Sequence, residues 1–158
     1  MRFVVVLVAA ALSASAQSAN WKPLEFLLGK WTGAAGAEDT PHGAGQGAFS
    51  FDLDLNQRII IRRNNASYDS GTPHDDLMVI YTEGSTRAIY FDSEGHVIRY
   101  HVTVPEANRA VFESEGTQAG PKYRLTYWLE RGSLRGQFEI AEPGGEFKKY
   151  LSWSSKRN

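Results

Sequence analysis

The chain has 158 residues, of which 42% are hydrophobic and 22% are charged, a composition that fits one globular domain and excludes a wholly disordered chain. Lys and Arg number 17 against 18 for Asp and Glu, so the net charge is -1 and there is no basic field to attract nucleic acid. The absence of Cys excludes disulfides, thiolate metal sites and cysteine nucleophiles.

Residues 1–16 have the layout of a secretory signal peptide. Arg2 precedes an apolar run over residues 3–12, and residues 14–16 read Ala-Ser-Ala, a small-residue cleavage pattern. The run is too short to cross a bilayer, which takes about 20 apolar residues. No second long apolar stretch follows, so we expect a secreted or periplasmic protein without a membrane span. Cleavage is expected near Ala16, with Ala19 as an alternative.

Strand signals dominate the remainder, after one short helix expected over residues 23–29, between a Pro and a Gly. The clearest strand covers residues 48–55, where Phe49, Phe51, Leu53 and Leu55 alternate with polar side chains. About ten strands are predicted in total, over residues 31–36, 48–55, 58–67, 76–82, 86–92, 96–104, 109–115, 123–130, 134–140 and 147–154.

The turns indicate how these strands connect. Gly-containing turns at residues 92–95, 130–133 and 142–145 are short, and short links join antiparallel neighbours. The pattern predicts a single all-β domain over residues 20–158, an antiparallel up-and-down barrel of about ten strands, because closure removes exposed sheet edges. A β-sandwich is the alternative. A barrel of this width leaves room for a small ligand.

Residues 27–36 read Leu-Leu-Gly-Lys-Trp-Thr-Gly-Ala-Ala-Gly. A short helix followed by Gly-x-Trp-x-Gly resembles the lipocalin-like (calycin) barrels, nearest to nitrobindin-type and uncharacterised secreted bacterial members. The resemblance implies that Trp31 closes one end of the barrel and that Lys156 or Arg157, from the last strand, packs over it. Nitrobindin-type barrels bind haem through a His near the C-terminus, but residues 147–158 contain no His, so no cofactor is expected.

Aromatic and Arg side chains suggest what a cavity would bind. On strand 58–67, Ile59 and Ile61 share a face with Arg63, and an inward Ile pair would carry Arg63 into the barrel; Arg62 is the alternative if the register shifts by one. An apolar cavity with Tyr hydroxyls and one Arg suits a small amphipathic molecule, carboxylates included, since Arg donates two parallel hydrogen bonds. The candidate ligand-binding residues are Trp31, Arg63, Tyr81, Tyr100 and Tyr127.

The sequence contains no Gly-x-Ser-x-Gly elbow, phosphate loop or dinucleotide fingerprint. We therefore expect non-catalytic binding of a small hydrophobic or amphipathic molecule, with no catalytic residues. One alternative is a barrel enzyme of isomerase or hydrolase type that uses His96 or His101 near Asp92, with Arg99; others are a haem-binding nitrobindin-type protein and a structural protein with a filled core. A His bonded to a carboxylate inside the cavity would favour the enzyme.

The other two histidines, His42 and His74, fall in the two longer loops, over residues 37–45 and 69–74. With Asp75 they could converge at the barrel mouth as an open metal site. Solvated loop side chains are the expected interpretation, so no metal site is predicted. The sequence pattern does not encode an oligomeric state.

Overall fold

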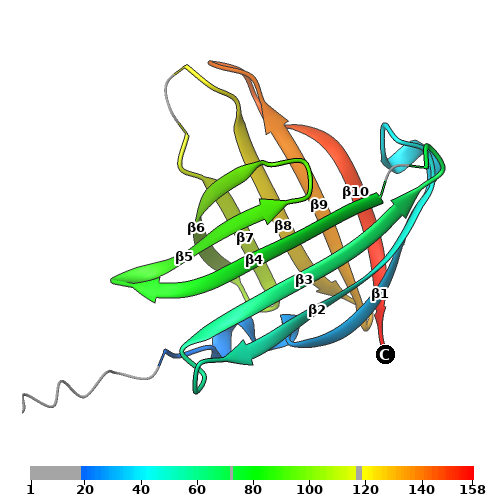
Figure 1. The fold of residues 1–158 in the computed structure, drawn as a ribbon. Coiled ribbons are helices and arrows are strands. Elements are labelled where there is room, and N and C mark those ends of the chain that lie inside the picture. The colour runs from blue at the N-terminus through cyan, green and yellow to red at the C-terminus, as the bar shows by residue number, and fades with distance from the viewer. Residues whose placement is uncertain (1–18, 72, 117–118) are drawn as a thin grey trace, which may run out of the picture.

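A computed structural model describes residues 19–71, 73–116 and 119–158; the predicted signal peptide lies outside these residues. The strands are β1 Gly29–Ala35, β2 Gly45–Asp54, β3 Ile59–Tyr68, β4 Pro73–Glu83, β5 Ser85–Asp92, β6 Val97–Glu106, β7 Arg109–Ser114, β8 Lys122–Glu130, β9 Ser133–Ala141 and β10 Lys148–Arg157. They form one closed barrel of ten antiparallel strands in the order β1-β10-β9-β8-β7-β6-β5-β4-β3-β2 (Figure 1). The predicted up-and-down barrel is confirmed, and the β-sandwich is excluded.

The predicted short helix is a 3-10 helix, η1 (Lys22–Leu27), with Pro23 in its first turn, and it covers one end of the barrel. Its Leu24 and Leu27 side chains are buried in the core. Gly29 then adopts a φ of 117°, a left-handed conformation that favours Gly, and turns the chain into β1. A second 3-10 helix, η2 (Ala37–Asp39), lies in the loop before β2.

The inward face of β3 is not the one expected. Ile60 and Arg62 are buried inside the barrel, whereas Arg63 is exposed on the outer surface. The prediction that Arg63 faces the lumen is therefore wrong, and the alternative register, with Arg62 inside, is correct. Three consecutive Ile residues, 59–61, supply apolar side chains to both faces, so only the pairing with β2 and β4 decides which face is buried.

Tyr81 on β4 is a second correction. Met78 and Ile80 point inward and are fully buried, which turns Tyr81 to the outer face, where it is half-buried. Apolar residues follow one another without interruption along this part of the strand, so alternation does not mark the inner face.

The half of the barrel nearest η1 is packed solid. Tyr127 forms edge-on aromatic contacts with Phe51 and Phe112, with ring centroids 5.4 and 6.0 Å apart. Around this cluster the fully buried side chains are Leu27, Trp31, Ile60, Met78, Ile80 and Leu134. The barrel is thus closed at one end.

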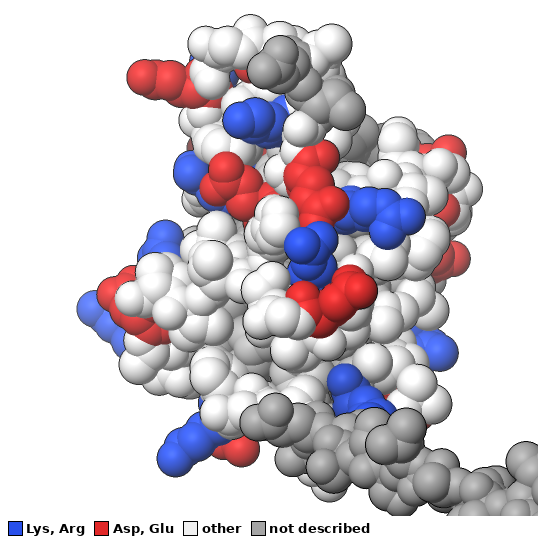
Figure 2. All heavy atoms as spheres, turned by 90° about the vertical axis from the view of Figure 1, so that its left-hand side faces the viewer, with Lys and Arg blue, Asp and Glu red and all other residues white. Residues whose placement is uncertain are grey.

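The outer surface carries charges of both signs. In Figure 2, Lys and Arg side chains alternate with Asp and Glu over the face in view and do not gather by sign. Within the described residues, no helix has the length and apolar character needed to cross a membrane.

Candidate functional site

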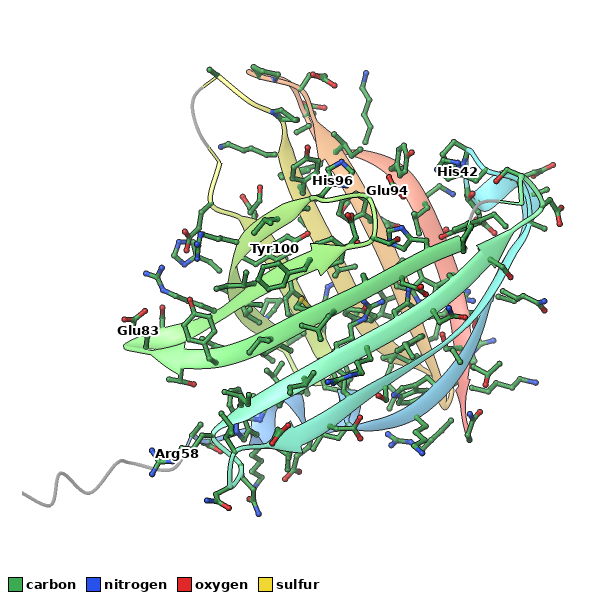
Figure 3. All side chains as sticks on the ribbon, viewed as in Figure 1. His42, Arg58, Glu83, Glu94, His96 and Tyr100 are labelled. Atoms are coloured by element: carbon green, nitrogen blue, oxygen red, sulfur yellow. The ribbon has the colours of Figure 1, made fainter. Side chains whose placement is uncertain are left out.

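The open half of the barrel holds a cavity of about 480 Å³. One side, here called the apolar wall, comes from β8, β9 and β10 and consists of Leu125, Phe138, Ile140 and Trp153. The opposite side, here called the polar wall, comes from β3, β4, β5 and the turn after β5, and consists of Arg62, Asn64, His74, Asp76, Tyr90, Asp92, Glu94 and His96. Figure 3 shows His42, Glu94 and His96 at the same end of the barrel, around the mouth of this cavity.

Arg62 and Asp76 form a buried ion pair at the base of the polar wall. Their side chains are 6% and 3% exposed, and Arg62 donates to Asp76 Oδ1. Asp76 Oδ2 accepts from Asn64 Nδ2 at 2.9 Å, so both carboxylate oxygens have a donor. Burial is the largest single influence and opposes the charge on Arg62, but Asp76 together with Tyr127 and Tyr90 outweighs it, so the pKa of the guanidinium is raised.

His74 stands above this ion pair. It belongs to β4 and not to a loop as expected, because strand pairing continues to Pro73 and sets His74 opposite Ala66. Its Nε2 lies 3.0 Å from the Tyr90 hydroxyl and 3.5 Å from Asp76 Oδ2, and its Nδ1 lies 3.2 Å from Glu94 Oε1. The contact with Asp76, supported by Glu94 and opposed by burial, raises the pKa of the imidazole.

Tyr90 extends the network to the mouth. Its hydroxyl donates to Asp92 Oδ2 at 3.3 Å, and burial, followed by the nearby Asp76 charge, raises the pKa of this phenol. Asp92 Oδ2 also lies 2.9 Å from His96 Nδ1. Burial opposes ionisation of Asp92, but hydrogen bonds from the backbone and ring of His96 outweigh it and lower the pKa of the carboxyl.

The histidines named for the enzyme alternative are not the ones that lie inside the cavity. His96 does pair with Asp92, but it is largely exposed at the mouth. His101 and Arg99 lie on the outer surface, where His101 Nε2 is 3.5 Å from Glu115. The histidine beside a buried carboxylate in the cavity is His74, which the sequence analysis assigned to a loop.

Two buried polar atoms near the base of the cavity have no hydrogen-bond partner among the described residues: Arg62 Nε and the Tyr127 hydroxyl. Tyr127 is fully buried, one inward position below Leu125 on β8, and its ring contacts Phe49. Burial, opposed by the neighbouring Arg62, raises the pKa of Tyr127 to about 12.

Of the remaining predicted binding residues, one lines the cavity and another lies in the packed end of the barrel. Tyr100 is buried and lines the cavity, while Trp31 lies beneath it in the packed end. Trp31 Nε1 donates to the Leu27 carbonyl at 2.8 Å, and Arg157 packs over its ring, as the family resemblance implied. Roles for Trp31, Tyr100 and Tyr127 in ligand binding stay predictions.

The residues that line the cavity do not fit the haem site that the nitrobindin-type resemblance implies. β10 contributes Tyr150, Leu151 and Trp153 to the cavity and no His. Both ring nitrogens of His74 are engaged, by Tyr90 and Glu94. Within the ranges that the structure describes, no group of three or more acidic or His side chains is arranged to hold a metal ion.

Comparison with known proteins supports the fold. No protein-family model matches the chain, and no curated protein is significantly similar to it in sequence. Among solved structures, the chain is similar to "Crystal Structure of Rv2717c from M. tuberculosis", a calycin-like barrel, with a TM-score of 0.61 and 11% identity over 87% of this chain and 96% of that chain. At this identity the similarity extends to the barrel architecture alone.

Proposed function

We propose that this protein binds a small amphipathic molecule inside its barrel without transforming it. The observation that carries the proposal is the 480 Å³ cavity, with an apolar wall facing a polar wall. Ligand sites are typically concave and mostly apolar, with a few fixed polar groups that orient the guest. The polar wall supplies such groups, because Asn64 bonds to Asp76, and Tyr90 bonds to His74 and Asp92.

We further propose that the mature protein acts outside the cytoplasm. The support is the order of charge, apolar run and small-residue site over residues 1–16. N-terminal sequencing of the protein from its host should give a start near residue 17 or 20. An intact residue 1 on the folded protein would contradict export by cleavage.

Native mass spectrometry of the protein purified from its host tests the binding proposal. Ala66→Phe puts a bulky ring on the cavity wall, while Ser67→Phe puts the same ring on the outer surface of the same strand. We expect a retained small molecule on the wild type and on Ser67→Phe, and its loss from Ala66→Phe. Bare polypeptide from the wild type, with no thermal shift across lipid and aromatic libraries, would contradict the proposal.

A second candidate function is acid–base catalysis. The observation that favours it is His74, which lies at the cavity wall between Asp76 and Tyr90. An imidazole beside a carboxylate can take a proton from a bound molecule and return one to it. The matching reaction class is proton transfer at carbon next to a carbonyl, which needs no further co-reactant.

Deuterium exchange at the α-carbon of small ketones in D₂O tests this candidate. The neutral fraction of His74, with Nε2 released from the Tyr90 hydroxyl, would take the proton, and solvent deuterium would replace it. His74→Gln should abolish the exchange, whereas His101→Gln, on the outer surface, should leave it unchanged. Exchange no faster with wild type than with His74→Gln would contradict the catalytic role.

A further inference from the structure

The outer faces of β3, β4 and β5 carry a continuous apolar patch. Buried inward side chains alternate with its members along each strand, so the patch points away from the barrel. The members, here called the outer patch, are Ile59, Ile61, Leu77, Val79, Tyr81, Ile89 and Phe91. Phe91 is 41% exposed and the others are partly exposed. The three strands cross the front of the barrel in Figure 1, and neither described helix, η1 or η2, lies over them.

The outer patch explains why these strands are apolar on both faces. Residues 59–61 are all Ile, residues 77–81 read Leu-Met-Val-Ile-Tyr, and residues 88–91 read Ala-Ile-Tyr-Phe. An antiparallel strand with one face in solvent alternates apolar and polar side chains, whereas a strand covered on both faces is apolar throughout. Contiguous apolar patches on the surface of a protein mark interaction sites. The composition of β3, β4 and β5 therefore indicates that a partner covers their outer face.

Charges of opposite sign flank the outer patch on its two sides. The row through its centre runs, by strand register from β2 to β6, as Asp52, Ile61, Val79, Ile89 and Arg99. Asp52 and Arg99 are exposed, and neither forms an ion pair with another described residue. The surface thus has an acidic side at β2, an apolar centre at β4 and a basic side at β6.

A two-fold axis along β4 makes this surface complementary to itself. Rotation about such an axis exchanges β2 with β6 and β3 with β5, so Asp52 of each copy faces Arg99 of the other. Val79 then meets its own counterpart at the axis. In the adjacent row, Arg63 of one copy faces Phe91 of the other, a cation–π arrangement. An axis across the strands would instead set the two acidic sides against each other.

We propose that two copies of this chain pair through the outer patch, about a two-fold axis that runs along β4. Sheets that pack face to face keep their strand directions within about 30° of each other, which this axis allows. Five strands and three outward positions per strand make up the contact surface, which measures about 24 Å by 20 Å. Each copy buries roughly 500 Å², and the pair about 1,000 Å², the lower limit of a specific interface. The dimer is therefore reversible.

This pairing goes beyond ligand binding and does not depend on it. The interface strands carry the polar wall on their inner faces, with Arg62 and Asn64 on β3 and Asp76 on β4. Since the axis runs along the strands, corresponding strands of the two copies point the same way. Both cavities then open at the same end of the dimer.

Sedimentation velocity of the protein purified from its host tests the pairing. The wild type should change from monomer to dimer as its concentration rises, and its Tm should rise in parallel. Val79→Lys sets an ammonium group against that of the second copy, and we expect a folded monomer. Its control, Val111→Lys, places the same charge on the outer face of β7, outside the patch, and should dimerise like the wild type.

Charge reversal at the two sides tests the orientation of the axis. Asp52→Arg alone, or Arg99→Asp alone, places like charges opposite each other at both contacts and should weaken self-association at least tenfold. An equimolar mixture of these two variants restores opposite charges at both contacts, so it should form a heterodimer about as tightly as the wild type pairs. Asp52 and Arg99 lie four strands apart in one barrel, so a contact within one copy cannot produce this rescue.

Several outcomes would overturn the proposal. One is a wild type that stays monomeric up to its solubility limit. A dimer that persists in Val79→Lys would place the interface on another face, and a mixture of the charge-reversed variants without heterodimer would contradict the axis. Monomers that bind phosphatidylcholine vesicles through the outer patch would identify a lipid surface as its occupant instead. If Val79→Lys fails to fold, the charge-reversed variants decide alone.

Discussion

The guanidinium carbon of Arg157 lies 4.3 Å from the centroid of the Trp31 ring. The same guanidinium donates to the carbonyl of Leu28, and its Nη2 lies 3.4 Å from the carbonyl of Phe26. One side chain from the end of β10 thus contacts β1, the helix η1 and the chain between them. Arg157, near the end of β10, thereby helps to close the end of the barrel that η1 covers.

Replacing Arg157 with Ala should lower stability without affecting the cavity. Loss of the cation–π contact and of the hydrogen bonds to two carbonyls should cost about 1–2 kcal/mol, or roughly 2–8 °C in Tm. Thermal unfolding followed by circular dichroism measures this. Lys156→Ala, next in the chain and exposed, is the control and should change Tm little. A loss of ligand affinity in folded Arg157→Ala would contradict the separation of the two ends.

Asp76→Ala should destabilise the barrel strongly. It leaves the Arg62 guanidinium buried without its counter-charge, a change that costs about 3–5 kcal/mol. Removing both charges, as Arg62→Met with Asp76→Leu, should recover most of the loss. Urea unfolding compares these variants with Asp75→Ala, whose side chain is exposed. Equal stability of Asp76→Ala and Asp75→Ala would show that the ion pair is not buried as described.

Stability should fall as the pH rises above 6.5 because of His74. Asp76 and Glu94 raise the pKa of this imidazole above its ordinary value of 6.5 in the folded protein. Its stabilising contribution is therefore complete below pH 6.5 and is lost as the pH rises through the raised folded pKa. Denaturant unfolding between pH 6 and 9 should show this decline for the wild type, and a flatter profile for His74→Gln. Identical profiles would contradict the contribution of His74.

Gly136→Ala should disturb both stability and binding. Gly136 lies between Tyr127 and Trp153 in the sheet, and a Cβ there would clash with the Trp153 indole. Overpacking of this kind costs about 1–3 kcal/mol, and displacement of Trp153 should alter its fluorescence and weaken ligand binding. Gly116→Ala, where a Cβ would meet only the flexible side chain of Lys122, is the control. Unchanged Trp fluorescence in Gly136→Ala would contradict the packing.

Alternating hydrophobicity, which reflects one exposed and one buried face on most strands, together with the short Gly-containing turns, predicted all ten strands and the barrel. It failed where a strand is apolar on both faces. Three consecutive Ile residues on β3 led to the choice of Arg63 with Arg62 as the alternative, and the apolar run on β4 led to the inward placement of Tyr81; both inward placements were wrong. In these strands the buried face depends on the neighbouring strands, which local alternation does not reveal.

The polar wall was missed for a related reason. A loop was expected over residues 69–74, whereas the strand begins at Pro73. The signal was present in the spacing, since Arg62 and Asn64 are two apart, as are His74 and Asp76. Pairing β3 with β4 across a tight turn sets Asn64 opposite Asp76 and brings these pairs together. The length of the turn was misjudged together with the inward faces of β3 and β4, so these residues were not brought together.

The seal formed by Trp31 and Arg157 has a kinetic consequence. A molecule bound in the cavity as proposed would enter and leave through the same mouth, past His42, Glu94 and His96. A side chain that narrows this mouth without contacting the bound molecule raises the activation barriers for entry and for exit by the same amount. Bulky substitutions at this rim would then slow exchange while leaving the equilibrium occupancy as it was.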